Sequence, residues 1–155
     1  MLWILSLDIP DGRVCYLTDT SHIHGSERLN PGLQNTINAF DVVWRGTRSE
    51  AGGPSLQNQR LFAFADTSVP NGVKCDILGN VYAGCGDGIH AWNKYGTLFG
   101  KILLGLVDGN FDTGCAKFCF VPGGKLVCFA EDRIYLVEGL VVEGATIAWE
   151  RWVER

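Results

Sequence analysis

Basic residues are few in this sequence: 13 Lys and Arg stand against 17 Asp and Glu, giving a formal net charge of -4 over 155 residues. Domains that bind nucleic acid usually carry a basic patch, so the composition argues against a nucleic-acid partner. No apolar stretch reaches the roughly 18 residues that a membrane-spanning helix needs. The apolar start, residues 1–9, has no basic residue and no small-residue cleavage site. We therefore expect neither a membrane span nor a signal peptide, and we interpret this start as a strand or a ragged beginning.

A Cys-x-x-Cys pair is also absent, although the chain has six cysteines, and this argues against a structural zinc site. Four of the cysteines, Cys15, Cys75, Cys119 and Cys128, lie in apolar segments that we expect to be strands. A buried thiol in such a strand behaves as a small apolar side chain. Cys85 lies in a glycine-rich turn, and we expect it to be the most exposed thiol.

Glycine, in contrast, is abundant, with 20 residues, and most glycines lie between short apolar runs. This composition is typical of an all-β protein with many tight turns. Three segments share one pattern, in which a glycine turn leads into an apolar strand and a second strand follows a short connection. The turns hold Gly12, Gly79 and Gly124, and the strand pairs are 13–17 with 37–42, 81–83 with 88–93, and 125–129 with 133–138.

The spacing of this repeat indicates a β-propeller. Gly79 and Gly124 are 45 residues apart, and polar insertions at 21–34 and 45–58 lengthen the interval from Gly12 to Gly79. A period near 45 residues with four short strands is typical of a propeller blade. We therefore predict an all-β, partial β-propeller of about three four-stranded blades, at about 1–66 with insertions, 69–104 and 115–155. A β-sandwich with chance similarity between its strands is the alternative, and the tail 144–155 is either an outer strand or a short helix.

The middle of the chain contains the stretches LFAFADTSVPNGVKCD at 61–76 and GNVYAGCGDG at 79–88, followed by Trp92 and residues 96–102. These segments resemble the gluconolactonase/lactonohydrolase (regucalcin-like) family, in its fungal lactonohydrolase branch. Weaker matches at 16–20 and 117–120 extend it over about 11–138. The resemblance implies a six-bladed propeller of which this chain is the C-terminal half. It also implies a divalent cation, calcium or zinc, that assists the attack of water on a sugar lactone or a related lactone.

The site that the resemblance implies centres on the turn Pro70-Asn71-Gly72. The family has an aspartate at the position of Asn71, where it binds the metal and serves as general base. An amide oxygen can still bind a metal, but an amide has no carboxylate to take a proton. A second ligand of the family would fall near Ile4 and Leu5, neither of which can bind a metal.

Several other residues are candidates for binding. We expect the segment 66–72 to face the central channel, with Asn71 nearest the axis, and we keep Asp19 and Asp66 as channel-face or rim positions. Turn capping is the competing interpretation of Asp19. His22 and His24 alternate in a way that allows a metal pair, although a solvated polar loop is the simpler interpretation.

The sequence thus predicts a lactonohydrolase-like protein that binds a small lactone and whose own catalysis is impaired. The alternative is a non-catalytic binding or protein-interaction module. Three blades cannot close a ring, so we expect either a shortened chain or self-association through the open blade faces.

Overall fold

The computed structural model describes residues 3–6, 12–21, 35–44, 53–105, 114–130 and 133–145. The expected sites at His22 and His24 and most of the tail 144–155 lie outside these residues. Among the described residues, no helix is long and apolar enough to cross a membrane. The elements are all β-strands: β1 (Trp3–Ser6), β2 (Val14–Asp19), β3 (Thr36–Trp44), β4 (Pro54–Phe64), β5 (Val73–Cys75), β6 (Val81–Cys85), β7 (Gly88–Trp92), β8 (Leu98–Leu103), β9 (Lys117–Val121), β10 (Lys125–Ala130) and β11 (Arg133–Val137).

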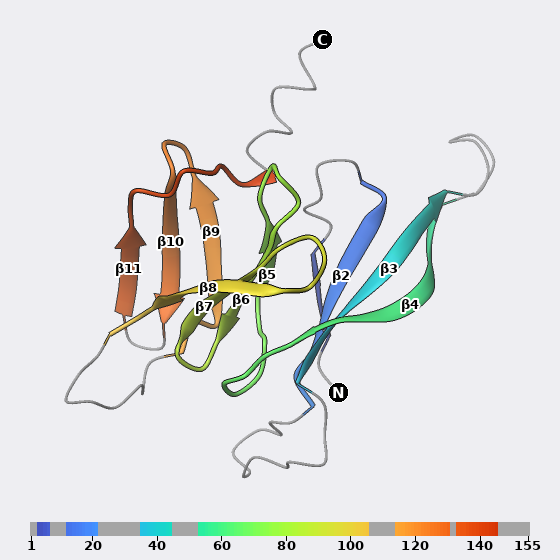
Figure 1. The fold of residues 1–155 in the computed structure, drawn as a ribbon, viewed down its shortest axis with the longest axis horizontal. Helices are drawn as coiled ribbons and strands as arrows, with labels where there is room; N and C mark the ends of the chain where they lie inside the picture. Colours follow the sequence, from blue (N-terminus) through green and yellow to red (C-terminus); the bar gives the residue numbers. More distant parts are fainter. Residues whose placement is uncertain are drawn as a thin grey trace.

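The strands form three antiparallel sheets, each made of consecutive strands. The orders are β1-β2-β3-β4, β5-β6-β7-β8 and β11-β10-β9. Figure 1 shows these sheets across the molecule in chain order, with the β5–β8 sheet in the middle. This arrangement confirms the all-β, open propeller-like fold and contradicts the sandwich alternative, because none of the described strands crosses from one sheet to another. The third sheet has three described strands, one fewer than the four expected.

The first strands of the three sheets lie next to one another. β1 and β2 both contact β5, and the Gly72 N–H, just before β5, donates to the Ala116 carbonyl, just before β9, at 2.9 Å. In Figure 1, β10 and β11 lie beyond β9 on one side of β5, and β3 and β4 lie beyond β2 on the other side. β5 and β9 are therefore the inner strands of their sheets, as in a propeller, where the first strand of each blade faces the axis.

The middle sheet is buried on both faces, since one face packs against the first sheet and the other against the third. Side chains alternate between the two faces along each strand. Val81 and Ala83 of β6 pack toward the first sheet, together with Tyr16 and Ile37. Tyr82, on the opposite face of β6, belongs to a second cluster formed with the third sheet. That cluster also contains Ile89, Ala91, Phe118, Leu126 and Cys128. Each large apolar side chain buried in this way contributes about 1.5–3 kcal/mol, so stacking of neighbouring sheets stabilises the fold.

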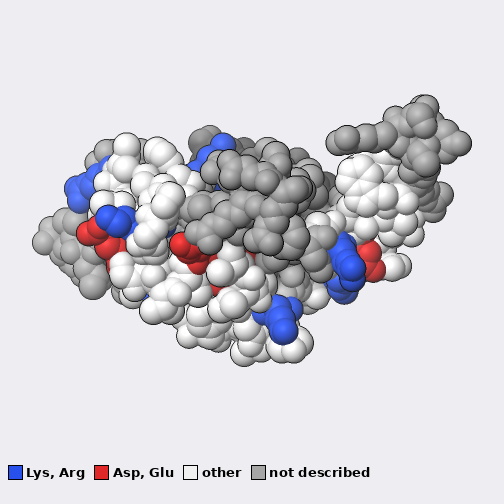
Figure 2. Space-filling view, turned by 90° about the horizontal axis from the view of Figure 1, so that it is seen from above, with Lys and Arg blue, Asp and Glu red and all other residues white. Residues whose placement is uncertain are grey.

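The opposite face of the third sheet remains open in the described structure. Phe129 of β10 is paired with Ile134 of β11, and Leu136 lies two residues further along the same face. The three side chains are exposed by 47%, 70% and 58%, respectively. Charged side chains on the view in Figure 2 are scattered among uncharged ones, and that view shows no extended patch of one sign among the described residues.

The polar segment 45–58 was expected to be an insertion, but its last part belongs to a strand. β4 begins at Pro54 and pairs with β3 to its end at Trp44. Because β4 is the outermost strand of its sheet, much of it faces solvent, and polar residues can occupy it. Asp41 of β3 accepts hydrogen bonds from Asn58 at 2.8 Å and from Arg60 at 2.7 Å across this pair. A solvent-exposed edge strand therefore resembles a loop in composition.

The cysteines partly follow the expectation. Cys15, Cys75 and Cys128 are buried in strands, and all six thiols are free. The expectation for Cys85 was wrong: this residue is only 3% exposed, whereas Cys119 is the exposed thiol. Cys85 ends β6, and the Cys115 N–H, from the segment before β9, donates to its carbonyl at 2.9 Å. Burial beneath this segment raises the pKa of the Cys85 thiol.

Candidate functional site

The turn Pro70-Asn71-Gly72 enters the inner strand β5 and is held by backbone hydrogen bonds on two sides. The Asn71 N–H donates to the Gly84 carbonyl at 2.7 Å, and the Gly84 N–H donates to the Gly72 carbonyl at 3.0 Å. The Gly72 N–H donates to the Ala116 carbonyl on the other side. Pro70 is buried, whereas Asn71 is half-buried. The turn is therefore fixed between the second and third sheets, and the side chain of Asn71 retains access to solvent.

Glycine makes this close approach possible. A Cβ atom on Gly84 would lie 2.0 Å from the backbone oxygen of Cys115. A Cβ atom on Gly72 would lie 3.1 Å from the carbonyl oxygen of Ala116. The backbones at Gly72 and Gly84 can lie this close to the backbone of Cys115 and Ala116 only because glycine has no side chain. The sequence GNVYAGCGDG thus brings the second and third sheets together next to Asn71.

A cluster of ionisable side chains lies at the same end of the middle sheet. Asp66 and Thr67 come from the β4–β5 connection, Asp87 from the β6–β7 hairpin, His90 from β7 and Lys101 from β8. The Gly86 N–H donates to the Thr67 carbonyl at 3.4 Å and holds the hairpin against this connection. His90 is fully buried, and Asp87 is 6% exposed. We call Asp66, Asp87, His90 and Lys101, with Thr67, the Asp–His–Lys cluster.

The contacts within the Asp–His–Lys cluster centre on Asp87. Its Oδ1 atom lies 2.5 Å from His90 Nε2 and accepts the Thr67 hydroxyl at 2.6 Å. Its Oδ2 atom accepts Lys101 Nζ at 3.1 Å, and the same ammonium donates to Asp66 Oδ1 at 2.7 Å. His90 Nδ1 lies 3.4 Å from Asp66 Oδ1. Asp66, Asp87 and His90 each offer one ligand atom within 4.8 Å of the other two, an arrangement that could hold a metal ion.

These contacts shift the ionisation of two of the groups. Burial acts to raise the pKa of Asp87, but hydrogen bonds from Thr67, His90 and Lys101 outweigh it and lower the pKa to about 2. Burial acts to lower the pKa of Lys101, but the hydrogen bonds to Asp66 and Asp87 outweigh it and raise the pKa. At neutral pH, Asp87 is therefore a carboxylate and Lys101 an ammonium ion.

The structure separates the three residues that the sequence singled out. Asp66 joins the Asp–His–Lys cluster, whereas no hydrogen bond or ion pair of the described residues links Asn71 or Asp19 to that cluster. Asp19 is only 2% exposed, and its Oδ1 atom accepts the Ser21 N–H at 3.0 Å, as a turn-capping residue does.

Sequence reasoning missed three members of the cluster. Asp87 was interpreted only as part of the hairpin turn Asp87-Gly88, and His90 lies in an apolar strand where it resembles a core residue. Lys101 lies on the outer strand β8, where a lysine is ordinary. The one signal in the sequence was His90, a polar residue in the otherwise apolar segment Gly88–Trp92. A buried polar side chain requires a partner, so His90 indicated that other polar groups lie next to it.

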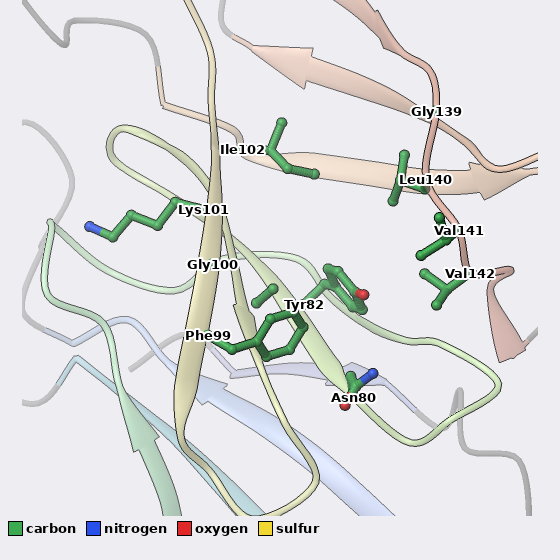
Figure 3. Close-up of a pocket in the computed structure, with 11 residues that line it drawn as sticks. Asn80, Tyr82, Phe99, Gly100, Lys101, Ile102, Gly139, Leu140, Val141 and Val142 are labelled. Carbon is green, nitrogen blue, oxygen red and sulfur yellow. The ribbon is translucent and has the colours of Figure 1, made fainter.

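A separate pocket of about 330 Å³ opens between the middle sheet and the segment after β11. Tyr82, Phe99 and Ile102 line one side, and Leu140 and Val142 line the other (Figure 3). Figure 3 also shows the Lys101 side chain pointing away from these residues. The pocket is therefore mainly apolar, and the charged end of Lys101 belongs to the Asp–His–Lys cluster instead.

Comparisons with known proteins give structural but no sequence-level matches. No protein-family model matches the sequence, and no curated protein matches it significantly. A solved gluconolactonase from Xanthomonas campestris, described as important in glucose secondary metabolic pathways, superimposes with a TM-score of 0.58 at 20% identity, over 88% of this chain and 35% of its own. A putative gluconolactonase solved by a structural genomics consortium superimposes with a TM-score of 0.51 at 18% identity, over 90% of this chain and 58% of its own.

The chain therefore spans about a third of the first of these proteins and somewhat more than half of the second. At such identities, the likeness concerns the backbone arrangement. It agrees with the open set of radially arranged sheets and with the resemblance suggested by the sequence. The protein thus shares the fold of gluconolactonase β-propellers.

Proposed function

We propose that this chain is a lactone-binding β-propeller protein of the gluconolactonase type, with its ligand site at the turn Pro70-Asn71-Gly72 and with little or no hydrolytic activity. The observation that carries this proposal is the position of the turn. It enters the inner strand β5 and is clamped between Gly84 and Ala116. The half-buried Asn71 beside it can donate and accept hydrogen bonds, as a site for a polyhydroxylated lactone requires.

The identity of Asn71 supports the proposal that hydrolysis is impaired. Activation of water at a lactone carbonyl needs a group that accepts its proton, and a neutral amide cannot do so near neutral pH. The carboxylate of the β4–β5 connection, Asp66, accepts a hydrogen bond from Lys101 at 2.7 Å. Water is therefore expected to attack a bound lactone without an efficient general base.

The divalent cation that the resemblance implies does not fit the described surroundings of Asn71. A hard cation such as calcium takes six to eight oxygen ligands, several of them carboxylates. Asn71 offers one neutral amide oxygen, and the two carboxylates of the Asp–His–Lys cluster are engaged with Lys101. We therefore assign no catalytic step to a metal at Asn71.

Binding of a sugar lactone tests this proposal. Saturation-transfer NMR with fresh glucono-1,5-lactone is expected to show transfer to the ligand in the wild-type chain. The variant Asn71→Ala is expected to bind about tenfold more weakly, the equivalent of about 1.4 kcal/mol, because it removes both amide hydrogen-bonding groups. Gln59→Ala is the matched control, since Gln59 is an exposed amide on β4, and it should bind like the wild type.

A second function is favoured by the open face of the third sheet. Phe129, Ile134 and Leu136 are exposed together there, and exposed apolar patches often mark interaction sites.

The NMR measurement also distinguishes the two functions. If the wild-type chain showed no saturation transfer, or if Asn71→Ala and Gln59→Ala bound equally well, the lactone site would be refuted. The interaction-module function would then be the better account.

A further inference from the structure

The three sheets pack in series, and this packing leaves two sheet faces at the ends of the series. Val81 and Ala83 of β6 face the first sheet, whereas Tyr82 faces the third. Figure 1 shows the first sheet on one side of the middle sheet and the third sheet on the other. We call the two remaining faces, which point away from the middle sheet, the far face of the first sheet and the far face of the third sheet.

The far face of the third sheet carries residues whose counterparts in the middle sheet are buried. The repeat of 45 residues between the glycine turns of these two sheets relates Ile89 to Ile134 and Ala91 to Leu136. Ile89 and Ala91 pack against the third sheet and are exposed by 0% and 5%. Ile134 and Leu136 are instead exposed by 70% and 58%. This face thus has the apolar side chains of a surface that a further sheet covers.

The far face of the first sheet is apolar along its outer strand β4. Ile37 of β3 packs toward the middle sheet, so its alternating neighbours Thr36 and Asn38 face away from it. Strand pairing places Phe64 opposite Thr36 and Leu61 opposite Asn38, and residues paired in this way lie on the same face. Leu61 and Phe64 are exposed by 53% and 60%.

From these two faces we infer that the protein forms a two-fold symmetric dimer, in which the far face of the third sheet of each copy packs on the far face of the first sheet of the other. This contact continues the sheet-on-sheet packing that occurs twice within the chain. Two copies of three sheets make a closed ring of six, and propellers have about four to eight blades. The inference does not depend on lactone binding.

A second copy suits these faces because each chain carries both halves of the contact. A head-to-tail contact between identical chains either closes into a ring or continues as a filament. The inner strands β1, β2 and β5 contact one another, and β5 is linked to β9 through the hydrogen bond between Gly72 and Ala116. The sheets are therefore arranged around a common inner edge, which favours closure over a filament.

The size of the faces also suits a stable dimer. The strands of the third sheet have five or six residues. At a strand spacing of about 4.8 Å and a rise of about 3.3 Å per residue, one face of this sheet has a flat area of about 250 Å². Ring closure covers four faces of this kind, and the relief of the side chains makes their accessible area larger than the flat area. The total lies near the roughly 1,200–2,000 Å² that stable complexes bury.

The charges on the far face of the third sheet lie at its margins. Lys125, at the start of β10, forms an ion pair with Glu138, which directly follows β11. Lys117 is the first residue of β9. The apolar side chains of Phe129, Ile134 and Leu136 thus lie within a charged border, as in the apolar core and polar rim of protein–protein interfaces.

Sedimentation velocity of the full 155-residue chain tests the dimer, and we expect a particle of twice the chain mass at concentrations of about 10–100 μM. Leu136→Lys and Leu61→Glu should each weaken dimerisation by about tenfold or more. Each variant places a charge on one side of both contacts. Leu78→Glu is the matched control, because Leu78 is an exposed leucine in the β5–β6 connection, outside both far faces, and this variant should dimerise like the wild type.

Mixing the two variants tests the head-to-tail arrangement itself. In a pair made of one Leu136→Lys chain and one Leu61→Glu chain, one contact joins two unchanged faces, and the other joins faces of opposite added charge. Equimolar mixing should therefore restore the dimer that each variant alone has lost. Both leucines are more than half exposed, so the variants should remain folded, and thermal melting verifies this.

The inference is overturned if the wild-type chain is a monomer over the whole concentration range, or if it forms polymers of increasing length. It is also overturned if either variant dimerises as tightly as the wild type, because a dimer that needs only one of the two faces is not a closed ring. Failure of the mixed variants to restore the dimer would equally refute the head-to-tail contact.

Discussion

Replacing Gly84 by alanine is expected to destabilise the protein by about 3 kcal/mol or more, because the added methyl group has no space. Its Cβ atom would lie 2.0 Å from the Cys115 carbonyl oxygen and 2.9 Å from the carbonyl carbon. Both are backbone atoms and cannot move aside as a flexible side chain can. The third sheet would have to shift away from β6, and the hydrogen bonds that fix the Asn71 turn would be strained.

Urea unfolding followed by tryptophan fluorescence measures this effect. Gly100→Ala is the matched control, since Gly100 is also a strand glycine, but a methyl group added to it would meet no atom within 4 Å. We expect the control to change the free energy of unfolding by at most about 0.5 kcal/mol. Equal stabilities of the two variants would mean that β6 and the segment before β9 are not in contact at Gly84.

Replacing Asp87 by asparagine is expected to lower stability at pH 7 by about 2–3 kcal/mol. The contacts to Thr67, His90 and Lys101 lower the pKa of Asp87 from 3.8 to about 2, and each pKa unit corresponds to about 1.4 kcal/mol. Because the pKa is lower in the folded than in the unfolded protein, the carboxylate stabilises the fold above about pH 4. This contribution is lost as the pH falls toward 2.

The stability difference between wild type and Asp87→Asn should therefore be largest at neutral pH and should vanish near pH 2. Unfolding curves at several pH values, in the presence of chelator, measure it without a contribution from bound metal. Asp41→Asn serves as the control, because Asp41 forms its ion pair with Arg60 at the exposed edge of the first sheet. A difference that stayed constant between pH 7 and pH 2 would show that the charge of Asp87 is not responsible.

The strands of the middle and third sheets could be predicted because local features determine them. Gly79 and Gly124 adopt positive φ angles of 83° and 66°, and apolar strands follow both. Glycine adopts such angles at little cost, so turns and strands were both visible in the sequence. The β4 segment from Pro54 to Asn58 was missed because it belongs to a solvent-exposed edge strand, whose polar composition resembles that of a loop.

The candidate site was predictable only in part, because its contacts join residues that are distant in the sequence. Asn71 was singled out by its motif and stays a prediction, whereas Asp66 was singled out by its place in the same segment and lies in the Asp–His–Lys cluster. The association of Asp66 with His90 and Lys101 depends on the packing of the β4–β5 connection against β7 and β8. Burial of Cys85 likewise depends on the segment before β9. Such contacts join residues from different sheets or strands, and hydrophobic periodicity carries no information about them.

Proton release from fresh glucono-1,5-lactone is the most direct measurement of what this protein does with a lactone. The assay compares the purified 155-residue chain with buffer, first with added calcium or zinc and then with excess chelator. Because Asn71 supplies no general base, we expect a rate within about twofold of the spontaneous one, unaffected by the chelator. Turnover at about 1 s⁻¹ or faster, abolished by the chelator, would contradict this expectation and would identify the chain as an active metal-dependent lactonase.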